Sequence, residues 1–160
     1  MMTLYRSFTR LDNADRWLVV QAASVMALVW AGLRLLRFST LRRILYSCAG
    51  SQIMRPARRP DARAINRVRW AIRAVAARFP AATCLVQALA GQLMLERRGL
   101  PCELRIGVRA GCAGRVPIEA HAWVECNGGV AIGAIGDLSA FHVLTAPASH
   151  ASRDSLFNGD

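Results

Sequence analysis

The chain has 160 residues, of which 54% are hydrophobic and 19% are charged. That length is enough to bury one core, so we expect one compact domain. Twenty-one Lys and Arg against ten Asp and Glu give a formal net charge of +11. Such a charge suits an acidic peptide, an anionic membrane surface or nucleic acid. Aromatic residues are sparse and none alternates with a basic run, so we expect no nucleic-acid partner.

The first fifty residues are expected to be helical. The run WLVVQAASVMALVWAGL, residues 17–33, carries no charge and lies between Arg16 and Arg34. A membrane-spanning helix needs about 20 apolar residues, and Gln21 and Ser24 dilute this shorter run. The next stretch alternates apolar pairs with arginines, which is typical of an amphipathic helix. We therefore expect one or two helices that pack on the domain or lie at a membrane surface, with a membrane span over residues 17–33 as the alternative.

Residues 51–62, SQIMRPARRPDA, are predicted to be a linker because they combine two prolines with clustered arginines. Asp61 is placed to cap a following helix, in which apolar residues recur every three or four positions as far as Phe79. The arginines of that helix fall largely on its other faces. They are either a solvated surface or a peptide-binding surface.

A second helix is predicted within FPAATCLVQALAGQLMLERRGLP, residues 79–101. Pro80 ends the preceding helix, Thr83 caps the new one, and Gly99 stops it after about residue 98. Cys84 thus falls in the first helical turn, where unpaired N–H groups and the helix dipole stabilise a thiolate. A thiolate is the nucleophilic form of cysteine.

Beyond Pro101 the apolar period changes to two, in residues 103–110, 119–126 and 128–135. Asn127-Gly128 is a tight-turn signal between the second and third of these runs. The predicted class is therefore α+β, with a helix packed on a small antiparallel sheet and further helices at the N-terminus.

The five cysteines are odd in number, show no C-x-x-C spacing and follow no cleavable signal sequence. This pattern predicts free thiols in a reducing cytoplasm. Four of them together with a histidine match no known zinc-site spacing, so we expect no metal and no cofactor. The four are Cys84, Cys102, Cys112 and Cys126.

One strand carries a candidate general base. Alternation in AHAWVE puts three side chains on one face of the strand, namely His121, Trp123 and Glu125. If the helix of Cys84 packs its N-terminus over that face, the sulfur meets the imidazole and the two form a nucleophile–base pair. The alternative is structural, because cysteine is commonly buried and a strand histidine is commonly a hydrogen-bonded filler.

The segments TCLVQALAGQLMLERRGLPCELRIGV (83–108) and EAHAWVECNGGVAIG (119–133) resemble the transglutaminase-like cysteine peptidases that remove leader peptides in lasso-peptide biosynthesis. The resemblance covers roughly residues 67–144 and implies a papain-like core. It implies that Cys84 attacks the last peptide bond of the leader and forms an acyl-enzyme. It also implies that His121 is the base of a Cys-His-Asp triad.

The third triad member is where the chain departs from that pattern. Relatives place an aspartate about where Gly133 stands, and the first aspartate downstream is Asp137. Asp137, a backbone carbonyl or no third member are the open alternatives. Gln87 and Trp123 are candidate substrate-binding residues, with a surface position and core packing as their structural interpretations. The N–H of Cys84 is the expected oxyanion donor, and His142 is a lesser candidate base.

The resemblance also implies partners. Residues 1–60, an N-terminal helical region and linker, do not look like a fused leader-recognition domain. The peptidase domain, residues 61–146, is therefore expected to act on a precursor peptide presented by a separate leader-recognition protein, beside an ATP-dependent macrolactam cyclase. Residues 147–160 are expected to be a disordered tail. Two alternatives are a non-catalytic scaffold and a basic protein with peripheral membrane contact through residues 1–50. The expected location is cytoplasmic, or membrane-associated under the second alternative.

Overall fold

The computed structural model describes residues 12–53, 61–111 and 118–144. Helices come first along the chain and strands follow. The helices are α2 (Asn13–Leu35), α3 (Phe38–Ile53), α4 (Ala62–Ala76) and α5 (Cys84–Glu96). The strands are β1 (Cys102–Ala110), β2 (Ile118–Cys126), β3 (Gly129–Ile132) and β4 (His142–Val143), with a 3-10 helix, η1 (Leu138–Ala140), before β4.

Both predicted helix caps are present. A carboxylate oxygen of Asp61 accepts hydrogen bonds from the N–H groups of Arg63 and Ala64, and the hydroxyl of Thr83 accepts one from the N–H of Val86. These bonds satisfy N–H groups that have no partner within the helix. The turn after α5 ends at Gly99, whose φ of 77° suits glycine. Helix α5 itself ends at residue 96, two residues earlier than expected.

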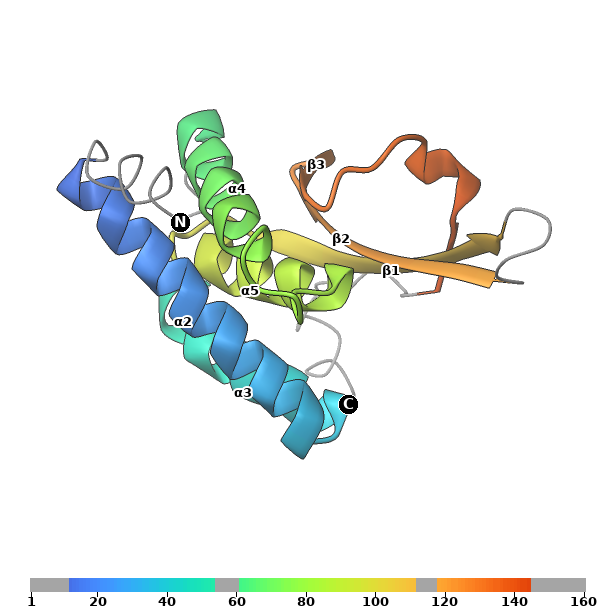
Figure 1. The fold of residues 1–160 in the computed structure, drawn as a ribbon, viewed down its shortest axis with the longest axis horizontal. Helices are drawn as coiled ribbons and strands as arrows, with labels where there is room; N and C mark the ends of the chain where they lie inside the picture. Colours follow the sequence, from blue (N-terminus) through green and yellow to red (C-terminus); the bar gives the residue numbers. More distant parts are fainter. Residues whose placement is uncertain (1–11, 54–60, 112–117, 145–160) are drawn as a thin grey trace, which may run out of the picture.

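The sheet is antiparallel, with strand order β3-β2-β1-β4. Asn127 and Gly128 have φ of 52° and 78° and form the predicted hairpin turn between β2 and β3. Helix α5 lies against one face of β1 and β2, while the connection from β3 to β4 arches over the opposite face (Figure 1). The α+β prediction of a helix on a small antiparallel sheet is confirmed.

The hydrophobic core runs without a break from α2 to β3. Helix α2 packs against α4 and α5, and α3 packs against α5, so the N-terminal helices share a core with the sheet. Helix α3 extends to residue 53, so the start of the predicted linker is helical. The rest of that linker, and the predicted tail at 147–160, lie outside the described residues.

A disulfide joins Cys102 on β1 to Cys126 on β2. The two residues face each other in the strand register, with their Cα atoms 4.4 Å apart. The expectation of free thiols throughout is therefore wrong for this pair, because only the strand register reveals that the two cysteines are opposite. Cys48 and Cys84 are free, and Cys112 lies outside the described residues.

One carboxyl group is buried beneath α3. Glu96 is 6% exposed, and its Oε1 accepts a hydrogen bond of 2.8 Å from the Nε2 of Gln92. Burial raises the pKa of Glu96 to about 7, and the Gln92 hydrogen bond and the positive charge of Arg42 only partly oppose this rise. Arg42 and Tyr46 of α3 line a small cavity beside this carboxyl.

Removal of the disulfide should destabilise the protein. A Cys102→Ser/Cys126→Ser variant is expected to lose about 3 kcal/mol of unfolding free energy, because its unfolded chain is no longer cross-linked. Urea unfolding with and without a reductant measures this loss. Cys48→Ser, which changes a free thiol, should keep the reductant sensitivity of the original chain. Equal midpoints with and without reductant in the original chain would contradict the cross-link.

The stability should also depend on pH through Glu96. Its folded pKa of about 7 lies above the unfolded value of 4.5, so the folded state keeps a proton that the unfolded chain releases. The stability contributed by this bound proton is therefore fully present below pH 4.5 and is lost as the pH rises through 7. Glu96→Gln should be the more stable protein at pH 8, by an amount on the order of 3 kcal/mol. Thermal unfolding across this range tests it, with the half-exposed Glu103→Gln as the matched control.

Candidate active site

Cys84 is the first residue of α5 and carries a free, half-buried thiol. Thr83 caps the helix just before it, and no acidic residue lies in the first turn. Within the described part of the chain the N–H of Cys84 donates no hydrogen bond. The sulfur therefore sits at an electropositive helix start beside an available N–H group, as the sequence predicts.

His121 lies on β2, where its Nε2 is 2.8 Å from the carbonyl oxygen of Gly133. A carbonyl only accepts, so Nε2–H donates this hydrogen bond and Nδ1 of the neutral ring keeps a free lone pair. The imidazole stacks on Trp123 with 6.1 Å between ring centroids and contacts Phe141 at 5.9 Å. The ring is thus held from three directions with one nitrogen available as a base.

The structure does not bring the thiol and the imidazole together. Cys84 packs against the core, which contains Ala122 and Val124 of β2, whereas the alternating residues His121 and Trp123 face the opposite side. The expectation that the helix packs its N-terminus over the histidine face is therefore wrong. In the described ranges no hydrogen bond joins the sulfur of Cys84 to the ring.

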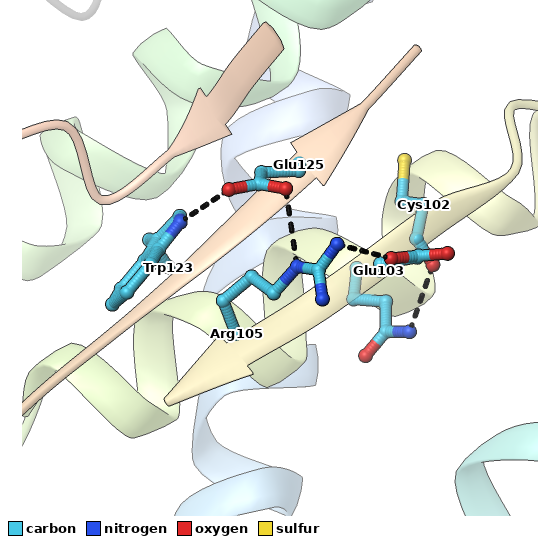
Figure 2. A network of polar contacts seen from close by, with 6 residues as sticks. Cys102, Glu103, Arg105, Trp123 and Glu125 are labelled. Carbon is cyan, nitrogen blue, oxygen red and sulfur yellow. Dashed lines mark hydrogen bonds and ion pairs between the residues drawn. The ribbon is translucent and has the colours of Figure 1, made fainter. Parts of the chain in front are cut away.

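The physical reason lies in the two rows of side chains. The row that faces α5 is apolar, while the opposite row is charged and aromatic. Figure 2 shows Trp123, Glu125 and Arg105 side by side across the two strands. Trp123 Nε1 donates to Glu125 at 2.9 Å, and Arg105 pairs with both Glu125 and Glu103. Burial of the apolar row beneath a helix requires no desolvation of charged groups. Helix α5 therefore packs on the apolar row.

Asp137 also has a different role from the predicted one. Its Oδ1 accepts hydrogen bonds from the hydroxyl of Ser139 at 2.6 Å and from the N–H of Ser139 at 2.9 Å. These bonds lower the pKa of the fully exposed Asp137 carboxyl. Asp137 thus caps η1, and the structure brings no atom of it to the imidazole among the described contacts. The carbonyl of Gly133 takes the third position beside His121.

Gly133 cannot easily be replaced at that position. Its φ is 80°, and a Cβ atom there would lie 2.9 Å from the carbonyl oxygen of Ala122. Both features penalise any residue with a side chain. An aspartate at this position, which the resemblance implied, is therefore incompatible with the local backbone of this chain.

The two predicted substrate-binding residues are occupied by internal contacts. Gln87 Nε2 donates to the carbonyl of Ala82 at 2.8 Å and ties α5 to the preceding loop. Trp123 is 2% exposed, so it supports the imidazole and offers almost no surface to a ligand. His142 is exposed on β4 at the sheet edge, opposite Val108.

Phe141 is a site residue that the sequence did not reveal. It is 5% exposed and packs between His121 and Trp123, and the guanidinium of Arg109 lies 4.6 Å from the centroid of its ring. In the sequence Phe141 is an isolated aromatic residue after Ser139 and Ala140, and no motif marks it as part of a site. No three His, Cys, Asp or Glu residues within the described ranges are grouped to hold a metal ion.

A cysteine at the start of a helix and a histidine on a strand of an antiparallel sheet together indicate a cysteine peptidase-type fold. Residues 25–146 match the family model described as the transglutaminase-like superfamily. The match covers more than half of the chain, so the chain belongs to this superfamily, whose members are generally cysteine peptidases and transglutaminases. The comparisons with curated proteins and with solved structures gave no match.

Substitution of Gly133 should be costly. Gly133→Ala places a Cβ at positive φ against the Ala122 carbonyl, so we expect a loss of about 1–3 kcal/mol of unfolding free energy. Chemical denaturation of the purified chain measures it. Gly136→Ala is the matched control, because its Cβ would meet no atom within 4 Å. Equal stabilities of the two variants would show that residue 133 is not constrained as described.

Proposed function

We propose that this chain is a cysteine peptidase that removes the leader peptide from a lasso-peptide precursor through an acyl-enzyme on Cys84. The observation that carries the proposal is the free, half-buried thiol at the capped start of α5, in a chain of the transglutaminase-like superfamily. The sequence resemblance to lasso leader peptidases supports the choice of substrate. A separate leader-recognition protein and an ATP-dependent cyclase are the proposed partners.

The proposed reaction uses few groups. The base takes the proton of the Cys84 thiol, the resulting thiolate attacks the carbonyl carbon of the bond between leader and core, and the N–H of Cys84 donates to the oxyanion. The C–N bond then breaks, the core peptide leaves as an amine that takes a proton from the base, and the leader stays on sulfur as a thioester. Water attacks this thioester and releases the leader acid. His121 is the proposed base through Nδ1, because Nε2–H is committed to the carbonyl of Gly133.

This reaction requires Nδ1 of His121 to come within hydrogen-bond reach of the sulfur. In the free chain the two groups face opposite sides of β2. The proposal therefore includes a rearrangement of the helix start or of the strand when the precursor and its recognition protein bind. Catalysis requires this rearrangement, whereas the second candidate function does not.

The second candidate is a non-catalytic scaffold that holds precursor, recognition protein and cyclase together. It is favoured by the separation of Cys84 from His121 and by the commitment of Asp137 to Ser139. A scaffold needs the fold and its surfaces but no reactive thiol. The two functions therefore predict opposite results for a change at Cys84.

Mass spectrometry of a candidate precursor, incubated with the recognition protein and the full chain, tests the peptidase directly. Cys84→Ser should slow leader release by about a thousandfold or more, because a hydroxyl replaces the thiolate. Cys48→Ser changes the other free cysteine and should leave the rate unchanged. His121→Ala should impair release, whereas His142→Ala should not.

The reaction intermediate gives a second measurement. Intact-protein mass spectra of quenched reactions should show the leader attached to the chain, and the adduct should be missing in Cys84→Ser. If Cys84→Ser still supports normal precursor processing in a complex that contains the cyclase, the scaffold function replaces the peptidase.

A further inference from the structure

Helix α2 presents an apolar face to the outside of the molecule. Trp17, Leu28 and Leu35 are 71%, 72% and 82% exposed, and no charged residue interrupts the helix between Arg16 and Arg34. We call this surface the α2 outer face and define it by seven residues: Trp17, Val20, Ala23, Ala27, Leu28, Trp30 and Leu35.

The core does not account for this face. The opposite side of α2 supplies the buried residues, and only 33% of the most apolar stretch of the helix is buried. Ser24, which also lies on the outside, donates its hydroxyl to the carbonyl of Val20 at 3.0 Å, so its polar group is satisfied within the helix. A helix exposed to water normally carries charges on its outer face. A large apolar patch of this kind indicates an interaction surface.

Three arginines near the α2 outer face, Arg34, Arg37 and Arg78, carry positive charges that no described carboxylate neutralises. Arg34 lies 5.5 Å from the ring centroid of Trp30, and Arg37 follows at the end of the helix. Neither these two nor Arg78 forms an ion pair with any described residue. The arginines of the sheet differ, since Arg105 and Arg109 are both paired with glutamates.

An apolar cavity of about 280 Å³ opens between α2 and α4 beside the same face. Its walls are Val19, Ala23, Ala27, Ala74, Val75 and Phe79, and Arg78 is the charged residue that lines it. An apolar slot with a cation beside it suits part of an acyl chain and the anionic headgroup that the chain carries.

We propose that the α2 outer face binds the surface of an anionic lipid membrane, with α2 lying in the plane of the membrane. Helix α2 is long and apolar enough to cross a bilayer, but its inner face is packed on α4 and α5, which favours the parallel orientation. The tryptophans and arginines near its two ends match the preferences of the lipid headgroup region. The apolar face supplies the hydrophobic contribution to binding, and the charges of Arg34, Arg37 and Arg78 favour anionic lipid.

Vesicle sedimentation of the full chain tests the proposal without any precursor, so its result is independent of the peptidase. The chain should bind vesicles that contain phosphatidylglycerol and not those of phosphatidylcholine alone. Val20→Gln/Leu28→Gln should weaken binding by about tenfold or more, because it removes exposed apolar surface. Arg34→Gln/Arg37→Gln should weaken binding and reduce its dependence on salt.

Ile118→Gln/Leu144→Gln is the matched control, because it changes two residues of similar exposure, 61% and 65%, in and beside the sheet. Circular dichroism checks that every variant is folded. Equal binding to anionic and neutral vesicles, or no binding at all, would overturn the proposal. An equal loss of vesicle binding in Val20→Gln/Leu28→Gln and in Ile118→Gln/Leu144→Gln would do the same. So would a dimer that the Val20→Gln/Leu28→Gln change converts to a monomer in the absence of lipid, since a second copy would then cover the face.

Discussion

The packing of α5 on the apolar face of the sheet is the constraint on which the rest of this structure depends. The helix is buried on nearly all sides, between the sheet and the other helices. Gly91 permits its close approach to β3, since a Cβ there would lie 2.7 Å from Cγ1 of Ile132. This contact sets Cys84 on the core side of the sheet. It also leaves the charged and aromatic row of β2 to face away from the helix.

That second row forms a layer of its own. Ion pairs between half-exposed groups contribute little stability individually, but here the Arg105–Glu125 pair links β1 to β2, and Glu103 on β1 binds the same guanidinium. The arch from β3 to β4 covers His121 and Trp123 with Phe141 and delivers the carbonyl of Gly133 to the imidazole (Figure 1). The result is an oriented histidine with a free Nδ1. In the free chain this ring lies on the other side of β2 from the sulfur.

The distribution of charge separates two sides of the molecule. The carboxylates of the sheet pair with Arg105 and Arg109, whereas Arg34, Arg37 and Arg78 form no ion pair with a described residue. Under the two proposals, the α2 outer face meets the membrane and the start of α5 meets the precursor.

The sequence by itself determined the features that depend on neighbouring residues. Asp61 and Thr83 cap their helices, Asn127 and Gly128 form the hairpin turn, and Cys84 begins α5, because short hydrogen bonds and local φ preferences decide these points. Alternation in β2 correctly divided its residues between two faces. It did not say which face a distant helix would cover.

Only the tertiary structure decided which face of β2 helix α5 covers. It also decided the pairing of Cys102 with Cys126 and the hydrogen bond from His121 to Gly133. Each joins residues that are far apart in the chain or on different strands. Strand register and the burial of whole apolar faces govern such contacts, and both are properties of the folded chain as a unit.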